Sequence, residues 1–178
     1  MVSLAMFCFC FSCFGFVNWA AACWNADFGI SLETANRYVS LFAVISLPVV
    51  VLAGFILDHV DRKRFCILIS AGYVFAVAAA FLLPGPGWIL PFVIVYPFFE
   101  GSVSACLWTL IPLTVKDPRH AVPAIALFTL TSNAGTLVGP PAVGSLVETF
   151  GSWQIGAAPV AISMILATLL LIRVRTES

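Results

Sequence analysis

One acidic side chain, Glu100, stands alone in the middle of a long apolar run. The run covers residues 88–115, and no lysine or arginine of the chain lies at a similar depth in an apolar run. A carboxyl group near the middle of a membrane is costly, so it is usually protonated, paired or turned towards a water-filled cavity. Glu100 could therefore bind a proton or a cationic substrate, or contact a polar neighbour or another subunit. The alternative is a structural glutamic acid, neutral and hydrogen-bonded between helices.

A second polar candidate, Asn133, falls near the middle of the run 121–147. It could share the depth of Glu100 and offer a donor and an acceptor to a substrate or to the carboxyl group. A hydrogen bond between helices is the simpler role for this side chain.

The composition predicts that these residues lie inside a membrane. The 178 residues are 62% hydrophobic and 9% charged, with a mean hydropathy of +1.10. Such a chain cannot bury its apolar surface in one water-soluble core. A helix that crosses about 30 Å of hydrocarbon needs roughly 20 residues. We therefore expect an all-α integral membrane protein in which one domain, residues 1–178, holds six transmembrane helices, at about 3–24, 38–57, 65–83, 88–115, 121–147 and 152–172.

The same sequence argues against several other classes of function. The net charge is zero and there is no basic patch with interleaved aromatics, so we expect no nucleic-acid partner. We find no phosphate-binding loop, intramembrane aspartate pair or Ser-His pair at membrane depth, and we expect neither an enzyme nor a bound cofactor. The six cysteines lack the spacing and histidine partners of a zinc site, and we interpret them as small packing residues: Cys8, Cys10, Cys13, Cys23, Cys66 and Cys106.

Residues 54–64 form the most polar stretch of the chain and hold five of its 16 formal charges. Gly54 lies near a predicted helix end, where it would let a neighbouring backbone come close. Asp58 follows one turn later on the same face, and the basic cluster 62–64 would remain in water. This order predicts a short turn between two membrane helices.

The basic residues also predict an orientation. Seven of the eight lie after the second run, after the fourth run or in the tail, including Lys116, Arg119, Arg173 and Arg175, whereas Arg37 lies alone on the other side. By the positive-inside rule those three segments are cytoplasmic, and with six helices both termini are cytoplasmic as well. We expect the plasma (cytoplasmic) membrane.

A short internal repeat accompanies this pattern. Gly54 and Asp58 end the second run, and Gly144 and Glu148 end the fifth run 90 residues later, against a half-length of 89. The second copy lacks the basic cluster, which fits a turn on the opposite face of the membrane.

The order of residues in 54–64 resembles the loop motif of the major facilitator superfamily. In that motif a glycine, three residues, an aspartate and a basic pair or triplet join the second and third helices of each six-helix half. His59 stands where the motif usually has a basic residue, and Asp61 where it has a second glycine. The fifth run resembles the family's glycine-proline motif, although a kinked packing helix without a transport role would explain it equally well. The matching residues are Gly54, Asp58, Arg62, Lys63 and Arg64 in the loop, and Gly135, Gly139, Pro140 and Gly144 in the fifth run.

The resemblance implies half of a major facilitator fold, built from two inverted three-helix repeats. The segment from 139 to the tail resembles the way the C-terminal halves end, and no arginine stands at position 97 or 98 as in many N-terminal halves. In this family the first and fourth helices line the central cavity, and the loop aspartate contacts a helix N-terminus of the other half in gating. Alternatively, the basic cluster only sets topology, and Trp19 belongs to an interfacial aromatic belt. The implied lining residues are Asn18, Trp19, Tyr96, Glu100 and Trp108.

These observations predict a secondary transporter half-unit that moves a small solute by alternating access, with proton symport as the possible coupling. Alternating access needs two bodies around one site, so we expect a homodimer or a second six-helix half in the lipid bilayer. The rival hypothesis is a non-transporting membrane subunit or a truncated, inactive fragment. A transporter should keep Glu100 wet, whereas a structural subunit should pack it dry.

Overall fold

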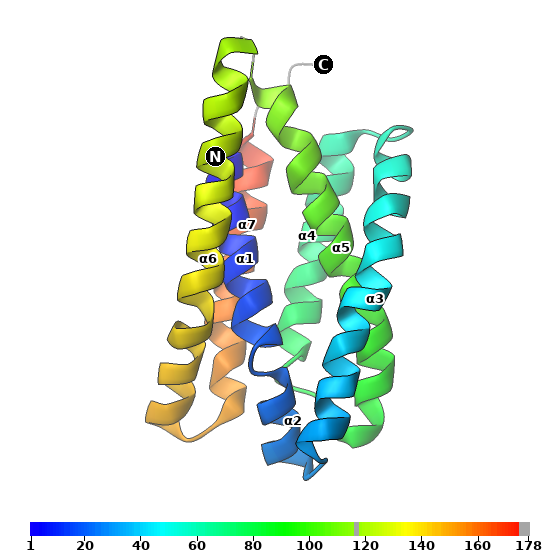
Figure 1. The fold of residues 1–178 in the computed structure, drawn as a ribbon, viewed down its shortest axis with the longest axis vertical. Helices are drawn as coiled ribbons and strands as arrows, with labels where there is room; N and C mark the ends of the chain where they lie inside the picture. Colours follow the sequence, from blue (N-terminus) through cyan, green and yellow to red (C-terminus); the bar gives the residue numbers. More distant parts are fainter. Residues whose placement is uncertain (116–117, 175–178) are drawn as a thin grey trace.

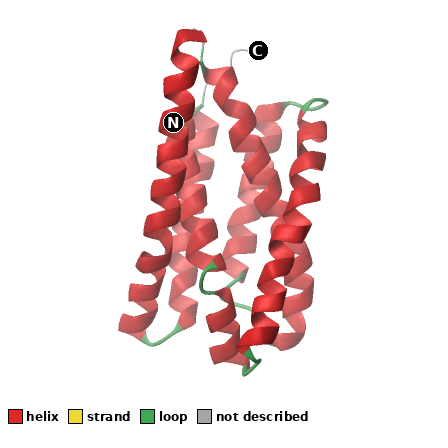
Figure 2. Cartoon of the chain, in the orientation of Figure 1, coloured by secondary structure: helices red, strands yellow, loops and turns green. Residues whose placement is uncertain are grey.

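A computed structural model describes residues 1–115 and 118–174, and every regular element in these ranges is helical. The helices run up and down side by side in one bundle (Figures 1 and 2). Short 3₁₀ turns at Pro86–Trp88 and Trp153–Gly156 precede α5 and α7. The α-helices are α1 Val2–Val17, α2 Ala20–Phe28, α3 Leu32–Leu57, α4 Arg62–Ala79, α5 Ile89–Thr114, α6 Ala121–Phe150 and α7 Ala157–Arg173.

Within the described residues, four helical segments are long and apolar enough to cross a membrane, and the bent pair α1 and α2 would make a fifth. The expected third span corresponds to α4, which is not among them. It has 18 residues, and its first turn holds three basic side chains. The structure is therefore that of an all-helical membrane protein with four or five clear spans: Leu32–Leu57, Pro86–Thr114, Ala121–Phe150, Trp153–Arg173 and the bent pair.

The first predicted helix, 3–24, is not continuous. The chain bends by 41° between α1 and α2, at Asn18 and Trp19. The indole Nε1 of Trp19 donates a hydrogen bond of 2.8 Å to the carbonyl of Pro140 in α6. This contact, made 121 residues away in sequence, holds the bend against the neighbouring helix.

Side-chain caps and a glycine set three further helix ends. Ser31 caps α3 by accepting a hydrogen bond from the Thr34 amide, and Asp61 caps α4 by accepting one from the Arg64 amide. α3 therefore begins at Leu32, earlier than the predicted residue 38. α6 continues through Pro140 and Pro141 and ends at Phe150, where the left-handed backbone of Gly151 closes the helix.

The helices pack in a regular pattern. α1 lies along α6 and α7, α5 lies along α3 and α4, and α4 also contacts α7. If α1, α3 and α4 are exchanged with α5, α6 and α7, respectively, the same pairs of helices remain in contact. The packing thus has the internal symmetry that two related three-helix units would produce.

Small residues allow α6 to lie directly on α1. A Cβ added to Gly139 would stand 2.5 Å from the backbone oxygen of Phe11, and one added to Gly135 would collide with the backbone oxygen of Phe7. Any side chain at these two positions would push the helices apart. Helices in lipid have no hydrophobic driving force to associate, so the van der Waals contacts made at this close approach hold α1 and α6 together.

An aromatic cluster fills the space between α1, α3 and α5. The ring of Phe16 lies 5.3 Å from that of Tyr96 and 5.7 Å from that of Phe92. Trp24 and Phe42 close the cluster from α2 and α3. Their edge-to-face and tilted contacts fix the rotation of α5 about its axis.

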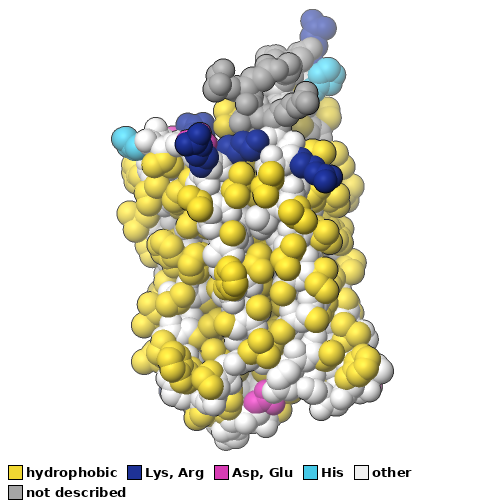
Figure 3. Space-filling model, turned by 180° about the vertical axis from the view of Figure 1, so that it is seen from behind, with side chains coloured by type: hydrophobic (Ala, Val, Ile, Leu, Met, Phe, Trp, Pro, Cys, Tyr) yellow, Lys and Arg dark blue, Asp and Glu magenta, His cyan; other side chains and the backbone are white. Residues whose placement is uncertain are grey.

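Charged side chains gather at the two ends of the bundle. Figure 3 shows basic side chains at one end of the bundle and an acidic side chain at the opposite end. Lys116 and Arg175 lie outside the described residues. Of the basic residues that the structure describes, Arg62, Lys63, Arg64, Arg119 and Arg173 lie at the first end and Arg37 near the second.

The α1–α6 contact generates a stability prediction. Gly139→Ala should lower the thermal midpoint in mild detergent by several degrees, because overpacking against a backbone atom costs about 1–3 kcal/mol. A thiol-reactive dye can follow unfolding, since all six cysteines are buried.

Gly54→Ala is the matched control, because no atom lies within 4 Å of a Cβ added there. Both changes replace a helical glycine by alanine, so any gain in helix propensity should be similar. Equal midpoints for the two variants would contradict the packing described above.

Candidate functional site

Glu100 lies on α5 at its contact with α3 and is half-buried. A Cβ at its neighbour Gly101 would stand 3.1 Å from the carbonyl oxygen of Ser46, so the two helices are close at this level. The Ser46 hydroxyl donates to the carbonyl of Phe42 at 2.6 Å and lies beside the Glu100 carboxyl. The carboxyl group thus has a polar neighbour and keeps some exposed surface.

Other polar groups surround this position. Glu100 is near enough to Cys10, Cys13, Tyr73 and Tyr96 to act on them electrostatically. The ion pairs Glu33–Arg37, Asp58–Arg62 and Asp61–Arg64 lie at helix ends, and none of them includes Glu100. The carboxyl group therefore has the Ser46 hydroxyl as its neighbour, and these thiols and phenols lie within its electrostatic range.

Tyr96 is buried and does not line an open cavity in this structure. Its hydroxyl oxygen lies 2.8 Å from that of Tyr73 on α4, and its ring belongs to the aromatic cluster. Sequence reasoning did not single out Tyr73 or Ser46. A polar atom within an apolar run is the signal for both, but many serines in this chain share that signal.

Asn133 is exposed on α6 and has no hydrogen-bond partner among the described residues. Its neighbour Ser132 lies 3.2 Å from the sulfur of Cys10, which Glu100 also influences. The two polar candidates therefore lie at a similar depth. They are not joined by a hydrogen bond within the described part of the chain.

The remaining predicted lining residues divide between the bend and the α5 surface. Asn18 is exposed and donates its side-chain amide to the Phe14 carbonyl at 3.0 Å, within its own helix. Trp19 packs on α6, where its ring edge would lie 2.6 Å from a Cβ at Gly144. Trp108 is half exposed, and its ring lies 4.8 Å from that of Phe128.

The loop between α3 and α4 is held by local ion pairs. Asp58 ends α3 and accepts a hydrogen bond of 3.1 Å from Arg62 one turn later, while Arg64 lies 3.6 Å from Asp61. Among the described residues, no atom beyond its own part of the helix lies within 4 Å of a Cβ added to Gly54, so no neighbouring backbone approaches closely there. Lys63 extends the same basic surface.

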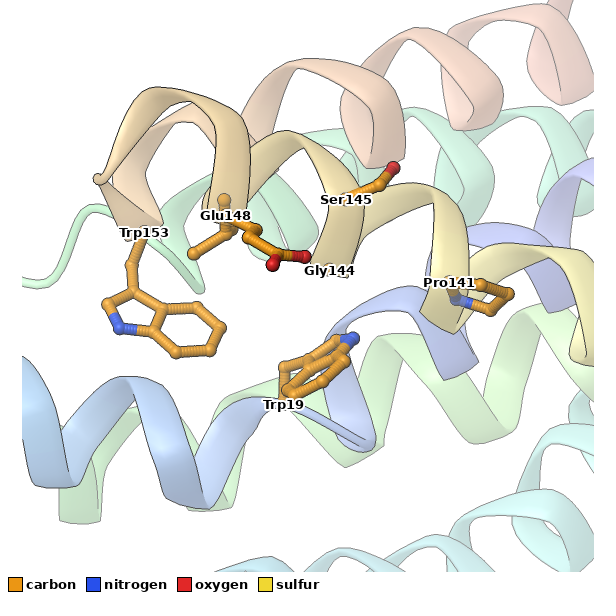
Figure 4. Close-up of a pocket in the computed structure, with 7 residues that line it drawn as sticks. Trp19, Pro141, Gly144, Ser145, Glu148 and Trp153 are labelled. Carbon is orange, nitrogen blue, oxygen red and sulfur yellow. The ribbon is translucent and has the colours of Figure 1, made fainter.

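A pocket of about 440 Å³ opens at the opposite end of the bundle, between the α1–α2 bend and the end of α6. Figure 4 shows the indole rings of Trp19 and Trp153 and the carboxylate of Glu148 directed towards the same space. The ring centroids of the two tryptophans are 5.9 Å apart. Gly144 and Ser145 form the wall on α6.

Neither region resembles a metal centre. Within residues 1–115 and 118–174, no three His, Cys, Asp or Glu side chains are placed to hold an ion. The six thiols are free and buried.

The chain matches known proteins over most of its length. The profile of the Major Facilitator Superfamily matches residues 2–178. A protein named MFS siderochrome iron transporter D, from Aspergillus fumigatus, is 22% identical over 143 residues, which are 78% of this chain and 24% of that protein. An uncharacterized MFS-type transporter of Bacillus subtilis, YbcL, is 24% identical over 129 residues, or 71% of this chain and 32% of that protein.

The chain thus spans only about a quarter to a third of the length of these relatives. Their names describe transporters, and the family match extends over all the helices described above. Together with the all-helical apolar bundle, this match establishes that the chain belongs to the Major Facilitator Superfamily.

Proposed function

We propose that this chain is one half of a secondary transporter, which moves a small solute by alternating access between itself and a second six-helix body. The observation that supports this most directly is the half-buried, polar position of Glu100 at the contact of α5 and α3. Family membership supports the general activity. A structural subunit would be expected to enclose this carboxyl group completely.

We further propose six spans in two inverted repeats, with α4 as the third span. Its basic first turn would lie at the membrane surface, which shortens the apolar part without preventing a crossing. The exchange symmetry of the helix contacts supports two related units of three helices.

The orientation follows from the charged ends. The basic end, with the 58–61 turn and the described chain termini, would face the cytoplasm, and the end that holds Glu148 would face outward. The plasma membrane is the membrane that we propose.

A second body would cover the polar surface that this chain leaves open. Asn18 and Asn133 are exposed, and the surface beside Gly54 is empty. A polar or charged side chain that faces hydrocarbon costs up to about 2.5–3.5 kcal/mol on insertion scales. Either a homodimer or a separate six-helix half would remove these exposures and complete the cavity.

In this assembly Glu100 would bind and release the coupling proton, with Asn133 as a candidate substrate contact. Glu100→Gln should then abolish uphill uptake and leave exchange partly intact, because the neutral amide resembles the protonated acid. Counterflow in proteoliposomes with a panel of labelled metabolites would identify the solute. Uptake under an imposed proton gradient would then measure the coupling.

The control for this change is Glu33→Gln, which alters an exposed carboxylate that pairs with Arg37 at 2.6 Å. That variant should keep gradient-driven uptake. If gradient-driven uptake is unchanged in Glu100→Gln, the carboxyl group has a structural role.

Pairing with a second body generates a separate prediction. Asp58 would turn from Arg62 to a helix N-terminus of the partner, so Asp58→Asn should weaken association or shift its conformational balance. Crosslinking in membranes and native mass spectrometry in mild detergent would measure the paired fraction.

Asp61→Asn is the matched control, because asparagine also caps a helix well and Asp61 serves α4 locally. It should leave the paired fraction unchanged. A dispersed monomer that transports would contradict the two-body mechanism.

A further inference from the structure

We propose that the pocket lined by Trp19, Trp153 and Glu148 binds a small organic cation, of the quaternary ammonium class, at the outer end of the bundle. This site is separate from Glu100 and does not depend on the transport cycle proposed above. Its recognition would combine two indole rings with one carboxylate.

The two rings are arranged to contact one ligand. Their centroids are 5.9 Å apart and their planes differ by 49°, so the two rings pack against each other at a tilt, and both line the pocket. Trp19 donates a hydrogen bond to Pro140, and its ring packs directly on Gly144, where any larger residue would collide with it. A ring fixed in this way loses little freedom when it binds a ligand.

The carboxylate adds the charge that rings alone lack. Glu148 is exposed on the last turns of α6, and no ion pair of the described residues includes it. Figure 4 shows its oxygens pointing over the space between the tryptophans. A cation in this position would meet the negative face of an indole and a carboxylate together.

The charges at this end of the bundle also favour a positively charged ligand. Asp27, Glu33 and Glu148 lie at or near it, whereas Arg37 is the basic residue that the structure describes there, and it pairs with Glu33. The surface around the pocket is therefore negative, which favours the approach of cations.

The remaining lining distinguishes an organic cation from a metal ion. One carboxylate and the Ser145 hydroxyl, which already donates to the Ala142 carbonyl, provide fewer oxygens than the six to eight that a calcium ion takes. Pro141, Val147 and the tryptophans supply apolar surface instead. The volume of about 440 Å³ lies within the range of small-molecule sites.

The test compares choline with its uncharged carbon analogue, 3,3-dimethyl-1-butanol, on the purified full chain in a non-ionic detergent. Isothermal titration calorimetry and tryptophan fluorescence should both detect saturable choline binding. The neutral alcohol, of almost the same shape, should bind roughly ten-fold more weakly, because it lacks the charge that the rings and carboxylate attract.

Two substitutions and their matched controls locate the site. Glu148→Gln and Trp153→Leu should each weaken choline binding by roughly ten-fold. Asp61→Asn, at the opposite end of the bundle, and Trp88→Leu remove an acid and an exposed tryptophan that do not line the pocket, and both should leave binding unchanged. Glu148 is exposed, so its variant should fold.

Equal affinity for choline and the neutral alcohol would overturn the proposal, since binding would then be apolar only. Unchanged choline binding in Glu148→Gln would also overturn it. Both results concern the purified chain alone, so they are independent of whether it transports a solute or pairs with a second half.

Discussion

The glycine contact between α1 and α6 is the interaction on which the other features depend. It places α1 in the middle of the bundle, where Phe16 contacts the rings of α2, α3 and α5. Those ring contacts fix the rotation of α5, and this rotation turns Glu100 towards α3. At its far end α6 meets Trp19 at Gly144, where the pocket that Trp19, Trp153 and Glu148 line is formed.

The second constraint is the cost of polar groups in lipid. The structure satisfies it by different means at different depths: Tyr73 and Tyr96 bond to each other inside the cluster, while Ser12 and Ser163 donate to backbone carbonyls. Glu100 keeps some exposure and Asn133 has no partner among the described residues. In a membrane protein such groups mark a wet cavity or a protein interface, and both options agree with a transporter half.

Of the six spans expected from the sequence, the described residues show four or five that are long and apolar enough. The sequence predicted the helical membrane fold because length and hydropathy decide whether a segment enters a membrane. It did not predict the bend at Trp19, since the bond to Pro140 depends on a helix far along the chain. It could not place Tyr96 within the aromatic cluster, where the structure buries this side chain. α5 is apolar on all sides, so hydropathy alone cannot say which face is inside.

The central claim is that the exposed polar side chains Asn18 and Asn133 and the half-buried Glu100 meet water or a second body, not lipid. Nitroxide labels at Asn133 and at Phe75, both exposed, test this directly in liposomes. A cysteine introduced at either position can be labelled selectively, because the six native thiols are buried. We predict that the label at 75 collides freely with lipid-dissolved oxygen. The label at 133 should be shielded from oxygen and reached by a water-soluble nickel complex, or by neither reagent where a partner covers it. Equal oxygen accessibility at the two positions would contradict the account.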